Sequence, residues 1–245
     1  MAFVYILILL QRVRLSVKNQ FSKYANQYKN HNIIQQIVAK SLVRELKTKP
    51  RKILELGCGS GQVYNHIDWD VDYYKAIDFS SSMCELHPKA DNIEVKCYDF
   101  DTEEFLNEIK DNDYDIVLSS SALQWSKDLS KIVKYLSYIT NEINAVLFTS
   151  NTFKTIQNIS ETNSPILDEN SIKEAFSKYF DCEFETIEYK LEFDNKKDLF
   201  DYIKNSGVSG GSATLDYKMA KKLFKEYKLN YLEFEVIFVK TLSKV

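Results

Sequence analysis

The stretch Lys52-Ile-Leu-Glu-Leu-Gly-Cys-Gly-Ser-Gly61 decides the fold of this chain. Its first half is a short apolar run typical of a buried strand, and its second half carries a glycine at every other position. Gly57, Gly59 and Gly61 allow a tight turn in which the backbone can approach a ligand closely. The dinucleotide fingerprint G-x-G-x-x-G would need its third glycine one residue later, where this chain has Gln62. The spacing therefore argues against a dinucleotide site.

Apolar periodicity predicts strands and helices that alternate along the first 150 residues. The expected strands are 52–56, 72–78, 93–97, 114–119 and 145–149, and the expected helices are 32–46, 62–67, 80–87, 102–109 and 129–139. The second half continues with helices at 152–162, 169–180, 196–204 and 216–228 and with strands at 184–193 and 231–241. Such alternation indicates an α/β fold with a parallel sheet covered by helices on both faces. Ligands in these sheets bind beyond the carboxyl ends of the strands, where the glycine turn would lie.

Composition limits the function classes. A chain of 245 residues with 44% hydrophobic residues can bury one substantial core, and its net charge of -3 gives no global basic field for nucleic acid. The four cysteines are scattered without a Cys-x-x-Cys pair, and the three histidines do not cluster with them. We therefore expect free thiols, with neither a disulfide framework nor a metal site.

The N-terminus begins with an unbroken apolar run at 3–10, followed by Arg12 and Arg14. The run is shorter than the roughly 20 residues that span a bilayer, and it lacks the basic start and cleavage site of a secretory signal. We expect residues 1–16 to form an extension outside the fold; an upstream start codon and a membrane-contacting segment are the alternatives. Residues 17–245 are expected to form a single domain without a membrane span.

An acidic residue, Glu55, stands two positions before Gly57. The pattern Glu-x-Gly-x-Gly-x-Gly over 55–61 resembles motif I of the class I S-adenosylmethionine-dependent methyltransferases. The resemblance implies a Rossmann-like α/β fold with a mostly parallel seven-stranded sheet, an antiparallel last strand, helices on both faces and a helical lid at 17–30 and about 152–228. It also implies S-adenosyl-L-methionine as the cofactor.

Acidic residues follow the second and third expected strands. Asp78 is expected to accept hydrogen bonds from both ribose hydroxyls, the role that an acidic residue has in dinucleotide folds, although it is also readable as a solvated loop aspartate. The methyltransferase pattern implies that Asp99 accepts from the adenine amino group and that the backbone of Phe100 meets the ring. Asp101 is a rival for this role.

Further cofactor contacts are expected from the serine run that leaves the fourth strand and from the lid. Ser119 and Ser120 are placed under the methionine part, while Trp125 fits a core position and a pocket wall equally well. The resemblance implies that Tyr24 or Tyr28, on a helix over the cofactor, reaches its carboxylate end. The predicted cofactor site comprises Tyr24, Tyr28, Glu55, Gly57, Cys58, Gly59, Gly61, Asp78, Phe79, Asp99, Phe100, Ser119, Ser120 and Trp125, with no metal.

The acceptor is indicated by longer stretches: Ala-Leu-Gln-Trp at 122–125 and the segments 147–150, 166–172 and 193–207. Together with 21–28, these resemble the malonyl-[acyl-carrier protein] O-methyltransferase family of biotin synthesis over about 17–241. The resemblance implies methyl transfer to the free carboxylate of a malonyl thioester on acyl-carrier protein, by a cytoplasmic enzyme that we expect to be a monomer. A carboxylate, ionised near pH 7, needs no general base.

A malonyl carboxylate needs a cation in its pocket. All four arginines (Arg12, Arg14, Arg44 and Arg51) precede the glycine turn, so we expect Lys154 or Lys204 to bind it, unless Arg44 or Arg51 folds back. Both lysines are equally readable as solvated side chains. The acidic carrier protein is expected to dock on a basic helix face formed by Lys218, Lys221, Lys222 and Lys225, which also has the plainer interpretation of a solvated face.

Three alternatives stay open from the sequence. The first is a class I methyltransferase for another small molecule, a free carboxylic acid or a quinone, because this fold hosts many acceptors. The second is a non-catalytic partner subunit that binds the cofactor. The third is an aminopropyl transferase, which would need an acidic loop after the fourth strand, where this chain has Ser119–Ser121.

Overall fold

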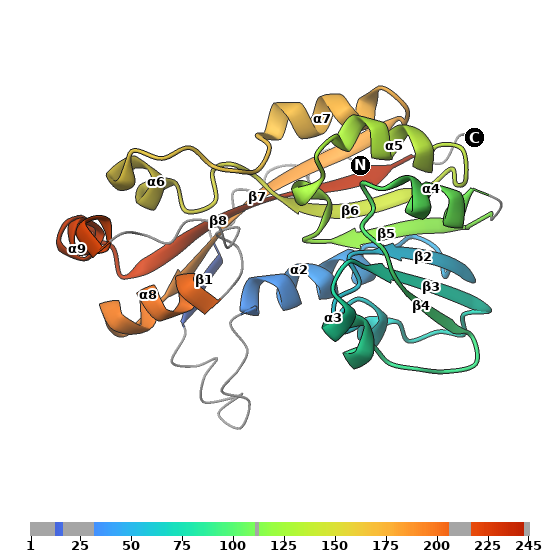
Figure 1. Cartoon of the computed structure of the whole chain (residues 1–245), viewed down its shortest axis with the longest axis horizontal. Helices are drawn as coiled ribbons and strands as arrows, with labels where there is room; N and C mark the ends of the chain where they lie inside the picture. Colours follow the sequence, from blue (N-terminus) through green and yellow to red (C-terminus); the bar gives the residue numbers. More distant parts are fainter. Residues whose placement is uncertain (1–12, 17–31, 111–112, 206–216, 243–245) are drawn as a thin grey trace, which may run out of the picture. The chain divides into compact units, whose positions relative to one another are not determined.

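The computed structural model describes residues 13–16, 32–110, 113–205 and 217–242. The sheet has the order β1-β7-β8-β6-β5-β2-β3-β4 (Figure 1). Its strands are β1 Val13–Ser16, β2 Lys52–Leu56, β3 Tyr73–Asp78, β4 Ile93–Cys97, β5 Ile116–Ser120, β6 Ile143–Phe148, β7 Cys182–Glu192 and β8 Tyr231–Thr241. The helices are α2 Ile33–Arg44, α3 Ser81–Leu86, α4 Glu103–Ile109, α5 Leu129–Leu136, α6 Lys154–Ser160, α7 Glu169–Ser177, α8 Lys196–Asn205 and α9 Tyr217–Glu226, with 3-10 turns η1 Tyr64–His66 and η2 Leu123–Trp125.

The chain divides into two compact units. The glycine-loop unit comprises Gln35–Leu147, Asp168–Glu185 and Ile237–Val245. The α8–α9 unit comprises Met1–Ile34, Phe148–Leu167 and Thr186–Val236. The glycine turn, Asp78 at the end of β3 and Asp99 after β4 all belong to the glycine-loop unit. The expectation of a single domain stays a prediction.

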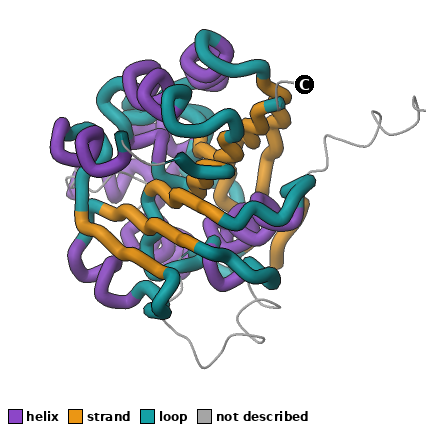
Figure 2. The backbone as a smooth tube through the Cα atoms, turned by 90° about the vertical axis from the view of Figure 1, so that its right-hand side faces the viewer, coloured by secondary structure: helices purple, strands orange, loops and turns teal. Residues whose placement is uncertain are grey.

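The glycine-loop unit is built on parallel strands that lie side by side (Figures 1 and 2). β2 pairs with β3 on one side and with β5 on the other, and every residue of β2 after Lys52 is buried. The sheet continues outward through β4 in one direction and β6 in the other. The strand order therefore reverses at β2, and the glycine turn that follows this strand stands at the switch point where α/β sheets bind ligands.

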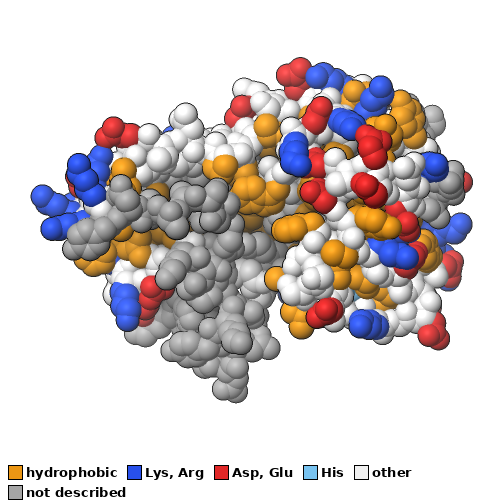
Figure 3. Space-filling view, viewed as in Figure 1, with side chains coloured by type: hydrophobic (Ala, Val, Ile, Leu, Met, Phe, Trp, Pro, Cys, Tyr) orange, Lys and Arg blue, Asp and Glu red, His pale blue; other side chains and the backbone are white. Residues whose placement is uncertain are grey.

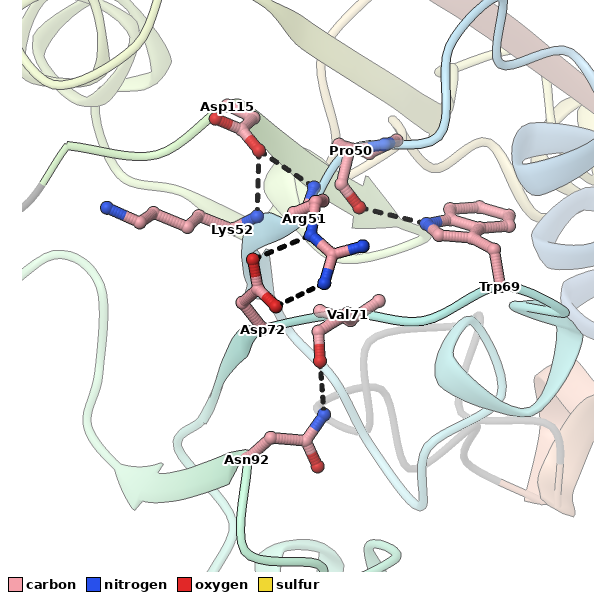
Figure 4. A network of polar contacts seen from close by, with 8 residues as sticks. All are labelled: Pro50, Arg51, Lys52, Trp69, Val71, Asp72, Asn92 and Asp115. Carbon is pink, nitrogen blue, oxygen red and sulfur yellow. Dashed lines mark hydrogen bonds and ion pairs between the residues drawn. The ribbon is translucent and has the colours of Figure 1, made fainter.

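Polar contacts fix the opposite, amino-terminal edge of the same strands (Figure 4). The backbone amides of Arg51 and Lys52 donate to one carboxylate oxygen of Asp115 over 2.7 and 2.8 Å, which ties the start of β2 to the start of β5. The Arg51 guanidinium makes a bidentate contact with Asp72, just before β3, with 2.6 Å from Nε to Oδ2. These contacts hold the strands in register from the end away from the glycine turn.

In the α8–α9 unit, the chain that leaves β6 pairs with β8. The amide of Thr149 donates to the carbonyl of Glu235 over 3.0 Å, and the amide of Phe153 donates to that of Glu233 over 2.8 Å. Because residue numbers rise on one segment and fall on the other, β8 runs antiparallel to β6, which confirms the expected antiparallel last strand. Phe153 packs edge-on against Phe234, with 4.9 Å between ring centroids, and starts α6 from a left-handed backbone conformation.

The seven expected strands are present as β2 to β8, and two local predictions differ from the structure. Residues 13–16 of the expected outer extension form the short strand β1, which pairs in parallel with the end of β7. An edge strand such as β7 offers unpaired backbone groups, so a few extended residues suffice for this pairing. The helix expected at 62–67 is only the turn η1, because Ile67 is extended and Trp69 bonds back to the carbonyl of Pro50. Among the described residues, no helix has the length and apolar character needed to cross a bilayer.

Candidate functional site

The glycine loop turns at the carboxyl end of β2. The amides of Gly57 and Cys58 donate to the carbonyl of Ile77 over 2.7 and 3.0 Å, and the amide of Gly61 donates to the carbonyl of Cys58 over 2.9 Å. Gly57, Gly59 and Gly61 have φ angles of 72°, 52° and 87°, a region that residues with a side chain rarely adopt. Backbone conformation alone therefore accounts for glycine at each of the three positions.

The space around the three glycines differs. A Cβ on Gly57 would come within 2.0 Å of the Cβ of Ala122, and one on Gly61 would come within 2.4 Å of Cδ of Pro88. A Cβ on Gly59 would meet no atom of the described residues within 4 Å. Gly57 and Gly61 are thus needed for packing within the protein, whereas Gly59 leaves an open approach to the backbone of the loop.

Asp78 ends β3 beside this loop and is only 8% exposed. Its Oδ2 accepts a hydrogen bond from the amide of Gly59, and its Oδ1 accepts one from the amide of Ser80, each over 2.9 Å. A carboxylate offers about four acceptor positions, so each oxygen can accept a further hydrogen bond. The neighbouring Phe79 is 76% exposed, which leaves an apolar ring surface beside the carboxylate.

The structure separates Asp99 from its rival Asp101. The carboxylate of Asp101 accepts from the hydroxyl of Ser126 over 2.9 Å and from the amide of Lys127 over 3.0 Å, so it fastens the loop before α5. Asp99 is exposed and uses Oδ1 to accept from the amide of Asp101 over 2.9 Å. Asp99 is therefore the more available of the two carboxylates, next to a half-buried Phe100.

The three serines at the end of β5 and directly after it differ in their environments. The Ser119 hydroxyl is buried and donates to the carbonyl of Leu56 over 2.9 Å, so it joins β5 to β2. The hydroxyl oxygens of Ser120 and Ser121 are buried and have no hydrogen-bond partner among the described residues. Ser121 also has a φ of 61°, and the side-chain amide of Gln124 donates to its carbonyl over 2.6 Å. Buried hydroxyls without partners are expected where a polar ligand supplies the partner.

The sequence prediction covered Ser121 only as a member of the serine run, and it did not single out Gln124 within the segment 122–125. Strand alternation turns Ser119 and Ser120 toward opposite faces, a difference that the sequence could have suggested. Trp125 is 38% exposed at the end of η2, so its ring is not a fully buried core side chain. The interpretation of Trp125 as a pocket wall stays a prediction.

Glu55 lies beneath the loop and is 1% exposed. The Tyr74 hydroxyl donates to its Oε2 over 2.5 Å, and Nε2 of His87 lies 4.0 Å from the same oxygen. Burial raises the pKa of the Glu55 carboxyl above its ordinary value, against the opposing effect of His87 and Tyr74. Cys58 is also buried, and burial raises the pKa of its thiol. Both side chains therefore point into the protein, and Cys58 can meet a ligand only through its backbone.

The remaining predicted residues lie elsewhere or outside the described chain. Tyr24 and Tyr28 lie outside the described residues. Lys154 is exposed at the first position of α6, in the α8–α9 unit, and Lys204 belongs to α8, where its side chain is not described. Arg51 is held by Asp72 at the amino-terminal edge of the sheet, which removes it as a cation for the opposite edge. Among the described residues, no cluster of three or more metal-ligating side chains occurs.

Comparison with known proteins shows what the chain is similar to. Residues 54–141 match the family model described as "Methyltransferase domain". Over 168 residues the chain is 26% identical to the malonyl-[acyl-carrier protein] O-methyltransferase of Bacillus cereus, a match that covers 66% of this chain and 62% of that protein. The enzyme of the same name from Haemophilus influenzae is 26% identical over 208 residues, or 79% of this chain and 77% of the relative. The chain thus matches less than two thirds of the length of the Bacillus cereus relative.

A solved structure, the YcgJ protein of Bacillus subtilis, superposes with a TM-score of 0.62 at 12% identity and covers 84% of this chain and 98% of that one. This likeness concerns the fold. The order of the strands, the glycine loop between β2 and β3 and the matched methyltransferase domain agree with one another. Residues 54–141, which carry the glycine loop, Asp78 and Asp99, are therefore similar to methyltransferase domains.

Proposed function

We propose that this protein is an S-adenosyl-L-methionine-dependent O-methyltransferase that methylates the free carboxylate of a malonyl thioester on acyl-carrier protein, an early step of biotin synthesis. The contact between Gly59 and Asp78 carries the cofactor part of this proposal, because it joins an open stretch of loop backbone to a carboxylate that can still accept hydrogen bonds. The names of the curated relatives support the acceptor part.

The residues at the carboxyl edge of the sheet fit this cofactor. Asp78 would accept from the ribose hydroxyls, and Asp99 would accept from the adenine amino group. The exposed ring of Phe79 offers an apolar surface for the adenine, and the unpartnered hydroxyls of Ser120 and Ser121 would bind the polar end of the methionine part. When bound, S-adenosylmethionine supplies an electrophilic methyl group to an attacking oxygen.

The protein's part in the reaction is to hold the acceptor in line rather than to activate it. A malonyl carboxylate is ionised near pH 7, because carboxyl pKa values lie near 4, so no proton has to be removed. Alignment at a near-attack distance of about 3–3.5 Å accounts for a large share of the rate of such a transfer. The two described histidines do not contradict this, since His87 is buried beneath the loop and His66 lies on η1.

The α8–α9 unit offers a basic surface for an acidic carrier protein. Lys218, Lys221 and Lys225 are exposed on α9, where basic side chains gather in Figure 3, and Phe224 on the same helix is 54% exposed. Lys222 is paired with Glu161 over 2.8 Å. Several exposed charges of one sign on one helix favour an acidic protein partner over a small free acid.

A panel of acceptors tests the proposal. The protein is incubated with S-adenosylmethionine and, in parallel, malonyl-acyl-carrier protein, malonyl-coenzyme A, free dicarboxylic acids and a quinol. Methylation confined to the malonyl thioesters supports the proposal. Methylation of a free acid or quinol instead assigns the second candidate, a class I methyltransferase for another small molecule. A cytoplasmic location and a monomeric state stay predictions.

A further inference from the structure

A buried cluster of three titratable side chains lies beneath the glycine loop, and the reaction above does not use it. Its members are Glu55 on β2, Tyr74 on β3 and His87 after α3. Glu55 and Tyr74 share one face of the sheet, because Ile53 pairs with Tyr74 and Glu55 follows two residues later. The His87 side chain is 0% exposed. Burying a carboxylate and an imidazole costs free energy, so their pairing calls for an explanation.

The hydrogen bond at the other ring nitrogen fixes how His87 faces Glu55. Nδ1 of His87 lies 2.9 Å from the carbonyl oxygen of Pro88, which can only accept, so Nδ1 carries a hydrogen. Nε2 has no hydrogen-bond partner among the described residues, and the nearest charged atom, Glu55 Oε2, is 4.0 Å away, beyond hydrogen-bond distance. A neutral ring would turn the bare lone pair of Nε2 toward this oxygen. The approach is favourable only if one further proton resides on the pair, on Nε2 or on the carboxyl group.

The same histidine touches the glycine loop. A Cβ on Gly61 would lie 2.4 Å from Cδ of Pro88 and 3.3 Å from Cδ2 of His87, so the third glycine packs directly on this dipeptide. The ring of Tyr64, which follows the loop on η1, lies 5.8 Å from the His87 ring and 5.1 Å from the Tyr74 ring. His87 therefore contacts the chain on both sides of the loop that would receive the cofactor.

We propose that His87 is a positioning residue for the cofactor: one proton that His87 and Glu55 share as an ion pair 4.0 Å apart, without a hydrogen bond, holds the glycine loop in the shape that receives S-adenosylmethionine. The inference rests on the proposed function, because it concerns the binding of that cofactor. Loss of the proton turns the contact between Nε2 and Oε2 from attractive to repulsive. The repulsion would displace Gly61, which packs on His87, and Gly57, which is two residues after Glu55.

Other titratable groups lie around the pair. Burial raises the pKa of the Tyr74 hydroxyl and of the Cys58 thiol, so both stay protonated. Tyr64 meets His87 through its ring. Asp78 raises the pKa of Glu55 by charge repulsion, which favours retention of the shared proton.

The direction in which pH changes cofactor affinity follows from the pKa of His87. Burial opposes its protonation, but the contact with Glu55 and the bond to Pro88 outweigh burial and raise the pKa of His87 above its ordinary value. A raised pKa of a basic group means that its favourable contribution is present at low pH and is lost as the pH rises through that pKa. Cofactor affinity should therefore fall on the alkaline side of neutrality.

Calorimetric titration of the full chain with S-adenosylmethionine at several pH values between about 6 and 9 tests the proposal. The ligand's own amino group titrates near pH 8, so wild type is compared with His87→Gln, whose amide donates to Glu55 without titrating. Wild type should lose about tenfold more affinity than His87→Gln over this range. His66→Gln is the matched control and should keep the wild-type profile, because His66 lies on η1 without a carboxylate beside it among the described contacts.

Equal pH profiles of wild type and His87→Gln would overturn the proposal. If wild type bound no S-adenosylmethionine at any pH, the cofactor assignment would fail, and a second readout would still decide the role of His87. In the ligand-free protein, the amide resonances of Gly59 and Gly61 should titrate together with the His87 ring and should stop titrating in His87→Gln. Glycine resonances that titrate in both proteins, or in neither, would show that the shared proton does not set the loop.

Discussion

The backbone amide of Gly59 donates a hydrogen bond to Oδ2 of Asp78 over 2.9 Å, which joins the middle of the glycine loop to the end of β3. The second oxygen of Asp78 holds the amide of Ser80. One carboxylate thus organises both chain segments that would surround the ribose.

Asp78→Asn should weaken S-adenosylmethionine binding about 10- to 100-fold, because hydrogen bonds to a charged group contribute about 1.5–3 kcal/mol each. The amide also cannot accept from both backbone donors. Isothermal titration calorimetry measures the effect. Asp72→Asn, which removes an exposed ion pair at the far edge of the sheet, serves as the control and should bind normally. Wild-type affinity in Asp78→Asn would remove this residue from the site.

Gly57→Ala should chiefly lower the stability of the fold, whereas Gly59→Ala should chiefly lower the affinity for the cofactor. The Cβ on residue 57 would clash with Ala122 at 2.0 Å, so Gly57→Ala should unfold at markedly lower urea concentration. Gly59→Ala should lose only about 1–2 kcal/mol from its positive φ, yet bind S-adenosylmethionine poorly, because the methyl group enters the open approach. Urea unfolding and calorimetry on both variants separate the two effects. A Gly59→Ala protein that binds like wild type would place the cofactor elsewhere.

Lys154→Ala and Lys204→Ala test the two candidate cations for the malonyl carboxylate. The variant that removes the true partner should raise the KM for malonyl-acyl-carrier protein about tenfold or more, since a charge-assisted hydrogen bond contributes about 1.5–3 kcal/mol. Its affinity for S-adenosylmethionine should not change. Lys134→Ala, an exposed lysine on α5, is the control. If neither variant changes the KM, both lysines are solvated side chains and the cation is another residue.

We expect the basic face of α9 to affect activity on malonyl-acyl-carrier protein and not activity on malonyl-coenzyme A. Replacing Lys218, Lys221 and Lys225 by alanine should lower kcat/KM for malonyl-acyl-carrier protein and flatten its salt dependence, because rim charges chiefly steer association. Activity on malonyl-coenzyme A should stay the same. Lys173→Ala with Lys178→Ala removes two lysines from ion pairs on α7 and controls for lost charge. Equal salt sensitivity of both substrates would contradict docking on α9.

The features of the fold that could be predicted from the sequence depend on residues that are close together in the chain. The apolar run 52–56, the glycine spacing and the position of Asp78 were enough to predict a parallel sheet with a ligand site at the end of β2. The helix expected at 102–109 is present as α4, and the hydroxyl of Thr102 caps its start by accepting from the amide of Phe105 over 3.3 Å. Such features need only neighbouring residues.

Contacts between distant segments could not be predicted. His87 and Glu55 are far apart in the sequence, and nothing in the spacing of either indicates that they meet beneath the loop. Ser119 was assigned to the cofactor, but its hydroxyl bonds to the carbonyl of Leu56, because the register of β5 against β2 sets which serine faces inward. Asp99 and Asp101 became distinguishable only once Ser126 and Lys127 were seen to use the second carboxylate.

The most direct measurement is the mass of the acyl group after incubation of the purified protein with S-adenosylmethionine and malonyl-acyl-carrier protein. We predict a gain of one methylene on the malonyl group, lost in Asp78→Asn at limiting cofactor and absent with acetyl-acyl-carrier protein, which has no free carboxylate. No gain, from protein that still binds S-adenosylmethionine, would contradict methyl transfer to malonyl-acyl-carrier protein.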